Sequence, residues 1–513
     1  MAAIPLKESM GNPLFSTKSV DKLRSDAEYG YGLKRTLTAF DLVLLGVGGI
    51  IGTGIFVLTG RAAAANAGPA VALSFTVAAV ASAFAGLCYA EMASMIPIAG
   101  SAYTYAYATM GELIAWIIGW DLILEYLVGA ATVSVGWSGY VCAFVKNVTG
   151  HELSATWTRA PFIWNEATQH LQGTGAIINL PAVFIVLAVT AILVVGIKES
   201  ARFNGIIVLV KVAVVLMFIV AAAPYVRHEN WVPFIPPNEG TFGRFGISGI
   251  LQGATMVFFA YIGFDAVSTA AQETKNPQRD LPIGILGSLV ICTVLYIAVS
   301  LILTGVVSYT KLSVPHPIAV GIAVTGSHIL ESAVEVGAIA GLSSVMLVLL
   351  LGQPRIFFSM ARDGLLPSVL ATVHPRFGTP HLTTIITGGF CALAGGVLPI
   401  DILGELTSIG TLFAFVLVSL GVMILRIKRP DIPRSFKVPG GTYLVPICGA
   451  LFSGMLMYTA TTHTIIRLFV WMAIGLVIYF TYGVKHSVLR TGKEPNVPFA
   501  DPHTETPPPR LVG

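Results

Sequence analysis

Long apolar segments are the feature that most constrains the fold of this chain. An α-helix needs about 20 mostly apolar residues to cross the hydrocarbon core of a bilayer, and the sequence contains twelve segments of that kind. They span residues 38–60, 68–96, 104–146, 177–196, 202–224, 246–272, 281–307, 329–362, 379–398, 403–426, 442–463 and 464–485. The third and eighth exceed one crossing, which predicts long tilted helices or helices extended along the membrane interface. We therefore predict an all-α polytopic membrane protein with twelve transmembrane helices.

The supply of charged residues agrees with this class of protein. Only 11% of the 513 residues are charged and 55% are hydrophobic, whereas a soluble domain carries about 25% charged residues. So few charges cannot cover a soluble surface, which excludes a cytosolic enzyme and a disordered scaffold. The net charge of +4 is small and spread along the chain, so the expected environment is the lipid bilayer and no nucleic-acid partner is expected.

Lysine and arginine residues predict the orientation in the membrane, because cytoplasmic loops are enriched in them. With the N-terminus inside, 22 of the 30 fall on the cytoplasmic side and 7 on the outer side, and Lys211 lies within an apolar segment. This distribution predicts a multi-pass protein of the cell (cytoplasmic) membrane with both termini in the cytoplasm. Residues 1–35 lack the apolar core of a signal peptide, and residues 486–513 are predicted to be disordered.

No pattern in the sequence is typical of a metal site or an enzyme active site. The five cysteines are scattered through apolar segments without a CxxC pair, and the histidines lie in loops, tails or at segment ends. Neither HExxH nor GxSxG occurs, whereas an enzyme needs converging catalytic groups. A channel would show a short filter repeated by oligomer symmetry. We therefore expect a transporter, with no cofactor and no bound metal.

The first apolar segment carries a cluster of glycines in mid-membrane. Five glycines fall within nine residues, at positions 46, 48, 49, 52 and 54, although each weakens a helix by about 1 kcal/mol relative to alanine. One interpretation is close helix packing, because Gly48 and Gly52 have the small-xxx-small spacing. The other is a helix broken at the membrane midplane, whose freed backbone groups face a binding site, as in many secondary transporters.

A second interruption is predicted in the sixth segment. Gly253 and Gly263 flank an aromatic run there, and an intramembrane acid, Asp265, follows. Segments one and six hold corresponding places in a five-plus-five inverted repeat, which is the pattern of a midplane substrate site. Helix N-termini attract anions, and unpaired carbonyl groups attract cations. Two such breaks therefore suit a zwitterion, such as an α-amino acid.

Several stretches of the chain resemble the amino acid–polyamine–organocation (APC) superfamily. The first helix of that superfamily is similar to FDLVLLGVGGIIGTGIFVLTG at 40–60. Its cationic amino acid transporter branch, bacterial members included, is similar to GSAYTYAY at 100–107, GWDLILEY at 119–126, FFAYIGFDAVSTAAQETKNPQRDL at 258–281 and RDGLLP at 362–367. Together the matches extend over about residues 30–490, nearly the whole chain.

This resemblance implies an amino acid permease with a LeuT-type fold, in which ten core helices form two inverted repeats. Helices 1 and 6 would be broken, and two peripheral helices would follow. The implied organisation is a cytoplasmic N-terminal tail at 1–37, the transport core at 38–426, helices 11 and 12 at 427–485 and a disordered cytoplasmic C-terminal tail at 486–513.

The same resemblance implies the groups that bind the substrate. Its carboxylate would lie on the backbone of Gly52, Thr53 and Gly54. Its ammonium would lie on the carbonyl groups of Ile50, Phe259, Ala260 and Ile262, and Phe259 would also close over the substrate as an aromatic gate. Because these are backbone groups, the side chains do not identify the amino acid, and cationic and small neutral L-amino acids both stay open.

Lys211 is predicted to couple transport to protons. It lies about 12 Å along a helix from the cytoplasmic edge of its segment, which is deep for a lysine that reaches back to the interface, and charges within membranes are functional by default. In similar proton-coupled proteins a lysine at this place occupies the second sodium site of sodium-coupled relatives. The resemblance implies contacts with carbonyl groups near Gly52 and with the hydroxyl groups of Ser343 and Ser344. Removal from water favours a neutral amine, so Lys211 is suited to load and release a proton, and no sodium is expected.

Other acids fall within or beside the predicted spans. Glu125 lies midway along the third segment, where an unpaired carboxylate is costly, so it is predicted to be protonated or paired. For Glu125 and Asp265 a structural role and a role in proton handling or substrate recognition both stay open. Asp41, Glu91 and Glu112 lie at predicted helix ends and are expected at the interface.

Two modes of transport fit these features. Proton symport of an L-amino acid into the cell by alternating access is favoured by Lys211, and exchange of one amino acid for another is the alternative. The sequence identifies no protein partner or accessory subunit.

Overall fold

A computed structural model describes residues 13–19, 36–96, 101–165, 170–195, 201–374, 377 and 379–492. The predicted tails therefore lie largely outside the described residues. The helices are α2 (Ala39–Ile50), α3 (Thr59–Ala62), α4 (Val71–Met95), α5 (Ser101–Thr109), α6 (Glu112–Ile123), α7 (Gly129–Thr149), α8 (Ala155–Thr158), α9 (Leu180–Val195), α10 (Ala201–Ala222), α11 (Gly246–Val257), α12 (Ala266–Thr269), α13 (Pro277–Val306), α14 (Pro317–Ala323), α15 (His328–Arg362), α16 (His381–Val397), α17 (Ile400–Lys428), α18 (Leu444–Thr459), α19 (Thr462–Ile478), α20 (Val484–His486) and α21 (Val488–Thr491). The strands are β1 (Phe162–Asn165) and β2 (His170–Gly173).

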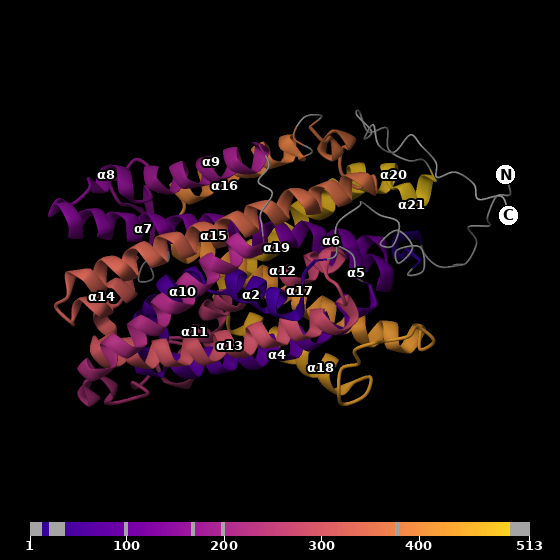
Figure 1. The fold of residues 1–513 in the computed structure, drawn as a ribbon. Coiled ribbons are helices and arrows are strands. Elements are labelled where there is room, and N and C mark those ends of the chain that lie inside the picture. Colours follow the sequence, from indigo (N-terminus) through magenta and orange to yellow (C-terminus); the bar gives the residue numbers. More distant parts are fainter. Residues whose placement is uncertain are drawn as a thin grey trace.

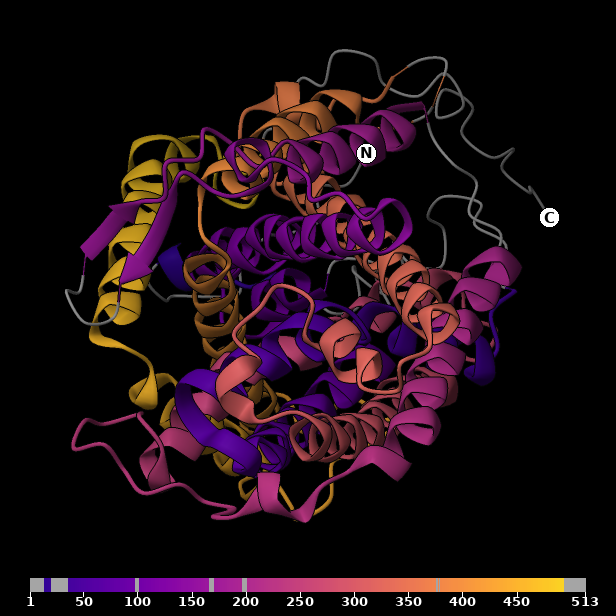
Figure 2. The same cartoon turned by 90° about the vertical axis from the view of Figure 1, so that its left-hand side faces the viewer.

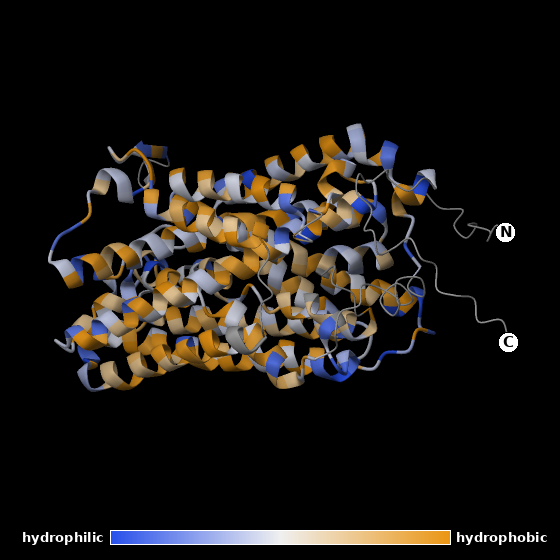
Figure 3. Ribbon diagram, turned by 45° about the horizontal axis from the view of Figure 1, so that its top comes forward, coloured by the Kyte–Doolittle hydropathy of each residue, from blue (hydrophilic) through white to orange (hydrophobic). Residues whose placement is uncertain are grey.

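The long helices lie side by side along a common direction and form one bundle (Figure 1). Apolar residues cover its length, and most of the hydrophilic residues lie near its two ends (Figure 3). One end holds α5 and α21, and the other holds α8 and α14 (Figure 1). We call them the α5 end and the α14 end.

Eight helical stretches of the described chain are long and apolar enough to cross a membrane. Their bounds are Ala39–Met95, Glu112–Thr149, Gly205–Tyr225, Gly246–Ser268, Pro277–Val306, His328–Arg362, Ile400–Lys428 and Thr462–Thr491. Three shorter helices, α9, α16 and α18, are also apolar. Large apolar side chains, including those of Phe184, Phe390 and Phe469, are exposed on the outside of the bundle, as a helix in contact with lipid requires. The chain is therefore a mostly helical, multi-pass membrane protein.

The third predicted segment is two helices with different positions. α5 ends before Gly111, whose φ of 101° is a conformation that favours glycine. α6 then begins at Glu112 and continues through a π-helical turn, Leu124–Val128, into α7. The predicted segment 104–146 thus consists of one long helical stretch, α6 with α7, preceded by the separate short helix α5.

A small β-hairpin interrupts the all-α pattern that the sequence predicts. β1 and β2 pair antiparallel, with Phe162 opposite Gly173, in the connection between α8 and α9. The hairpin lies against α19 (Figure 2), because the Trp164 ring stacks edge-on against His463 and accepts the guanidinium of Arg467 over its face. Each strand is four residues long, too short to appear beside the helical segments in a hydropathy pattern.

The first apolar segment lies in the interior of the bundle. Residues 46–60 are all buried, and α2 packs against α13, α10 and α15. α13 also packs along α4, and α11 packs against α4, α17 and α18. This arrangement brings the predicted interruptions of the first and sixth segments to the centre of the molecule.

Candidate substrate and proton site

The interruption in the first segment falls within its glycine cluster. α2 ends at Ile50, Ile51 adopts an extended conformation (φ −72°, ψ 98°), and helical structure resumes in a π-helical turn over Gly54–Leu58. The last carbonyl groups of one half-helix and the first N–H groups of the next have no partner within their own half. The break therefore presents backbone acceptors and donors in the protein interior.

The second interruption follows α11. A single 3₁₀ turn, Phe258–Tyr261, ends at Ile262, which is extended (φ −62°, ψ 137°). Gly263 then has a φ of 112°, in the region that glycine adopts without strain. Helical structure resumes in α12, so the chain is interrupted where the sequence predicts it.

The two breaks are in direct contact, and glycine permits the approach. A Cβ atom on Gly54 would lie 2.2 Å from Cα of Ala260. A Cβ atom on Gly263 would lie 2.8 Å from the carbonyl oxygen of Gly49. The glycine cluster therefore serves close packing as well as interruption of the helix. The helix is broken within the cluster, and the absence of side chains there lets the backbone of the sixth segment approach closely.

All seven predicted substrate-binding residues are buried at or beside this junction. They are Ile50, Gly52, Thr53, Gly54, Phe259, Ala260 and Ile262. The Phe259 ring reaches α7, where it lies 4.0 Å from the position of a Cβ atom on Gly129. The structure thus brings together the groups that the sequence assigns to one site.

Tyr296 of α13 joins the two breaks and was not predicted. Its hydroxyl lies 2.7 Å from the carbonyl oxygen of Ile50 and 2.9 Å from that of Ala260, to which it can donate. Its ring packs against Phe75 and Tyr261. A single tyrosine in an apolar segment has no pattern that would distinguish it from a core residue, so the sequence carried no signal for this role.

Lys211 reaches the end of the first half-helix. Its ammonium donates to the carbonyl oxygens of Gly48 (2.6 Å) and Ile51 (3.3 Å), and the residue is fully buried. Its aliphatic chain passes Gly341 of α15, where a Cβ atom would lie 3.3 Å from it. One contact therefore lies in the last turn of α2, at Gly48, and the other lies at the break itself, at Ile51.

The hydrogen bonds of Lys211 in the described chain do not include the two predicted serines. Ser343 donates to the carbonyl group of Ile339 (2.8 Å) and accepts from the indole N–H of Trp137 (2.9 Å). Ser344 donates to the carbonyl group of Gly341 (3.0 Å). Serine in a helix can bond to the carbonyl group of the preceding turn, and both serines do so here, while the described hydrogen bonds of Lys211 go to the backbone of Gly48 and Ile51.

Two predicted acids and an unpredicted tyrosine form a second cluster nearby. The hydroxyl of Tyr126 donates to Asp265 at 2.7 Å, and both residues are buried. Glu125, in the π-helical turn before α7, lies beside Asp265 and Thr411, yet neither of its carboxyl oxygens makes a well-formed hydrogen bond within the described chain. Two neighbouring carboxylates would repel each other if both were ionised. The pair is therefore suited to hold a proton.

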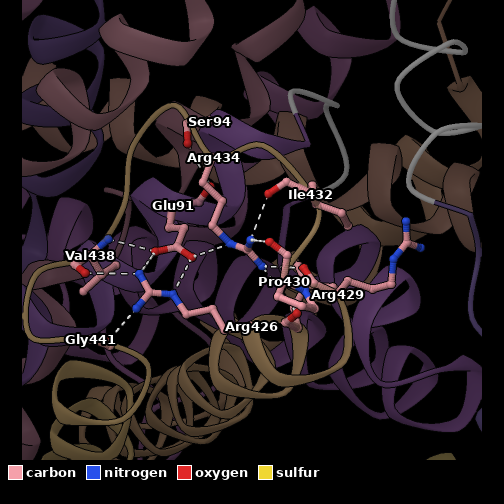
Figure 4. Close-up of polar contacts among 10 residues, drawn as sticks. Glu91, Ser94, Arg426, Arg429, Pro430, Ile432, Arg434, Val438 and Gly441 are labelled. Carbon is pink, nitrogen blue, oxygen red and sulfur yellow. Dashed lines mark hydrogen bonds and ion pairs between the residues drawn. The ribbon is translucent and has the colours of Figure 1, made fainter.

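Glu91, which was expected at the interface, lies near the end of α4 and is buried there in an ion-pair network. It lies between the guanidinium groups of Arg426 and Arg434 and accepts the backbone N–H of Val438 at 2.8 Å (Figure 4). Arg426 also donates to the carbonyl groups of Val438 and Gly441. The network attaches the connection between α17 and α18 to the end of α4. Glu112 is likewise buried, in an ion pair with Arg490.

A multi-pass helical protein with two facing helix breaks at its centre belongs to the transporter class. The family model described as "Amino acid permease" matches residues 37–487. The chain belongs to this amino acid permease family of the APC superfamily, which confirms the predicted superfamily and the prediction of a transporter rather than an enzyme.

Individual relatives are named for different substrates. The chain is 49% identical over 481 residues to the branched-chain amino acid permease BcaP of Bacillus subtilis, covering 94% of this chain and 100% of that protein. It is 46% identical over 476 residues to the methylthioribose transporter of B. subtilis, covering 93% and 99%. It is 39% identical over 421 residues to the vacuolar cationic amino acid transporter 4 of Arabidopsis thaliana, covering 82% and 68%.

Proposed function

We propose that this permease carries an L-amino acid into the cell together with protons, by alternating access to the site between the two helix breaks. The substrate carboxylate would lie on the backbone N–H groups at Gly52–Gly54, and the ammonium on the carbonyl groups of Ile50, Phe259, Ala260 and Ile262. The observation that carries the proposal is the ammonium of Lys211 on the carbonyl groups that end the first half-helix. Because these hydrogen bonds depend on the positive charge of Lys211, a change in its protonation would alter the backbone geometry at the break, where the substrate is proposed to bind.

A twelve-helix, LeuT-type architecture is part of this proposal. The stretch Ala39–Met95 has 57 residues, which at about 1.5 Å per residue is far more than one crossing. Counting it as two spans and adding the three shorter apolar helices brings the proposed number to twelve. The core would comprise 38–426 and the peripheral helices 427–485. We place the α5 end and both tails in the cytoplasm of a cell-membrane protein, in line with the distribution of lysine and arginine.

Proton coupling is supported by the groups within the bundle. Lys211 is fully buried, and its ammonium lies on backbone carbonyl groups that stabilise a cation. We propose that this ammonium takes the place that a sodium ion would occupy. Glu125, one turn before Gly129, and the neighbouring Asp265 offer a second place for a proton. No cofactor and no sodium enter this proposal. Ser343 would act by orienting Trp137, and Ser344 by its bond within α15, rather than through Lys211.

The substrate class follows from the backbone groups and the relatives together. A site made of backbone N–H and carbonyl groups recognises the α-carboxylate and α-ammonium of any L-amino acid. BcaP and the cationic amino acid transporter are named for different side chains, so we propose small or branched neutral amino acids and cationic ones as the candidates. A competition panel of alanine, leucine, lysine, arginine and methylthioribose against one labelled amino acid would rank them.

Uptake into empty proteoliposomes tests the proposal. With an inward proton gradient and no internal amino acid, we expect a labelled substrate to accumulate above its equilibrium level, and we expect an inward sodium gradient to have no such effect. Uptake that requires vesicles preloaded with amino acid would instead establish exchange. Exchange is the second candidate because the backbone site is compatible with both modes.

A further inference from the structure

The last described segment of the chain, residues 484–491, binds to the start of α6. Glu112 is fully buried at the N-terminus of that helix, where the helix dipole favours a negative charge. Its carboxylate accepts hydrogen bonds from Arg490 (2.7 Å), Tyr479 (2.9 Å), Tyr107 (3.1 Å) and the hydroxyl of Ser487. One carboxylate therefore joins α5, α6, the π-helical turn Tyr479–Gly483 after α19 and the C-terminal segment.

The same segment is also attached to the end of α15. The backbone N–H of Val488 donates to the carbonyl group of Asp363 at 3.0 Å. Next to it, Gly364 has a φ of 75°, and a Cβ atom there would lie 2.1 Å from the carbonyl oxygen of His486. The close approach of the two backbones depends on this glycine. The C-terminal segment thus connects the start of α6 to the end of α15.

A segment from the other end of the chain covers the same place. The backbone N–H of Glu112 donates to Ser16, and that of Lys18 donates to Tyr107, each at 3.1 Å. The ammonium of Lys18 pairs with the carboxylate of Asp363, which also accepts from the hydroxyl of Tyr103 at 2.6 Å. Both terminal segments therefore close over the α5 end, and each uses one of two acids, Glu112 and Asp363.

The connected helices are those that flank the candidate site. α6 continues through the turn that carries Glu125 and Tyr126, and α15 carries Gly341, beside which the side chain of Lys211 passes. The start of α6 and the end of α15 cannot separate while the C-terminal segment is bound to both. Opening the site toward this end requires the elements at this end to move apart.

We propose that residues 484–491 are a strap that keeps the site closed at the α5 end. The Glu112–Arg490 ion pair holds this strap in place. The strap rests on the proposed alternating-access function, since only a site that opens at this end needs such a closure. Release of Arg490 from Glu112 accompanies opening, and weakening the pair shifts the population toward the open state. The strap thereby sets how often the site faces this side of the membrane.

Labelling of a buried cysteine from the α5 side tests the strap. Ser268 is fully buried in α12 beside Tyr105 of α5, so Ser268→Cys is placed in full-length protein whose five native cysteines have been replaced. A membrane-impermeant maleimide is applied to the α5 side of reconstituted vesicles without substrate. We expect Arg490→Ala to raise the labelling rate at least about fivefold, within the usual range of conformational coupling. The matched variant Lys485→Ala, an exposed lysine of the same segment, should leave the rate unchanged.

A second cysteine separates opening from unfolding. Ala319→Cys lies buried in α14 at the opposite end, and its labelling should not respond to Arg490→Ala. An unchanged rate at Ser268→Cys would overturn the strap, and so would a rise at both cysteines or an equal rise with Lys485→Ala. Labelling requires no substrate, so the result is independent of whether an amino acid and a proton are the species carried.

Discussion

The ammonium nitrogen of Lys211 lies 2.6 Å from the carbonyl oxygen of Gly48, one turn before the break in the first transmembrane segment. A hydrogen bond to an ionised group is stronger than one between neutral groups, so the charge on this lysine stabilises the end of the first half-helix. Loss of the charge would weaken that attachment. Protonation and the geometry of the break are thereby linked in one contact.

Substitution of Lys211 by methionine should separate substrate binding from coupling. Methionine fills similar space along Gly341 but cannot carry a proton, so we expect proton-driven accumulation in empty vesicles to fall at least about fivefold while exchange between preloaded vesicles persists. Uptake by proteoliposomes under each condition is the measurement. The exposed Lys311 supplies the control Lys311→Met, which should behave as the wild type. Accumulation by Lys211→Met that still follows the imposed gradient would refute this coupling role.

Substitution of Gly54 by alanine should force the two breaks apart. The added Cβ atom would lie 2.2 Å from both Cα and Cβ of Ala260, and overpacking of this kind costs about 1–3 kcal/mol. We expect a lower thermal unfolding midpoint in detergent and loss of substrate binding. Gly389→Ala is the matched control, because it also lies within a helix but has open space around its Cβ position. Equal effects of the two substitutions would show that helix propensity, rather than contact between the breaks, is responsible.

Removal of the Tyr126 hydroxyl should impair transport without altering the packing of its ring. Tyr126→Phe deletes the hydrogen bond to Asp265 and leaves a buried carboxyl group with one partner fewer, at a cost of about 1–3 kcal/mol. Since each 1.4 kcal/mol is about tenfold in an equilibrium or rate, we expect a reduction of about tenfold in kcat/KM for uptake. Tyr458→Phe, at an exposed tyrosine of α18, should leave kcat/KM for uptake unchanged. Wild-type kinetics for Tyr126→Phe would assign the Tyr126–Asp265 contact to structure alone.

Local sequence patterns predicted the features that depend on local physics. Helix interruptions follow from glycine content, and both occur where expected, because Gly52, Gly54 and Gly263 weaken a helix regardless of the rest of the fold. Hydropathy likewise predicted long apolar helices, since each must match the bilayer by itself. The end of α5 also has a local cause, because Gly111 directly after it adopts a positive φ that a helix cannot contain.

Partners that are distant in the chain could not be predicted in this way. Glu91 and Arg426 are 335 residues apart, and no spacing rule connects them, so their ion pair could not be predicted. Tyr296 is a hydrogen-bond donor to two breaks only because α13 packs between α2 and α4. The serines expected to meet Lys211 form bonds within α15 or to Trp137, which depends on side-chain orientation rather than on residue type.

Neutralisation of Glu91 should destabilise the protein strongly, because it leaves two arginines buried without their counter-charge. Removing one member of a buried ion pair costs about 3–5 kcal/mol, and here Arg426 and Arg434 both lose their partner. We expect Glu91→Gln to lower the thermal unfolding midpoint far more than Asp431→Asn, which removes an exposed pair with Arg429 in the same connection. The double variant Glu91→Leu with Arg426→Leu should recover part of the loss, since it removes buried charges together, although Arg434 remains. If Glu91→Gln and Asp431→Asn shift the midpoint equally, the network contributes no more than a surface pair, and the connection between α17 and α18 must be held to α4 by its other contacts.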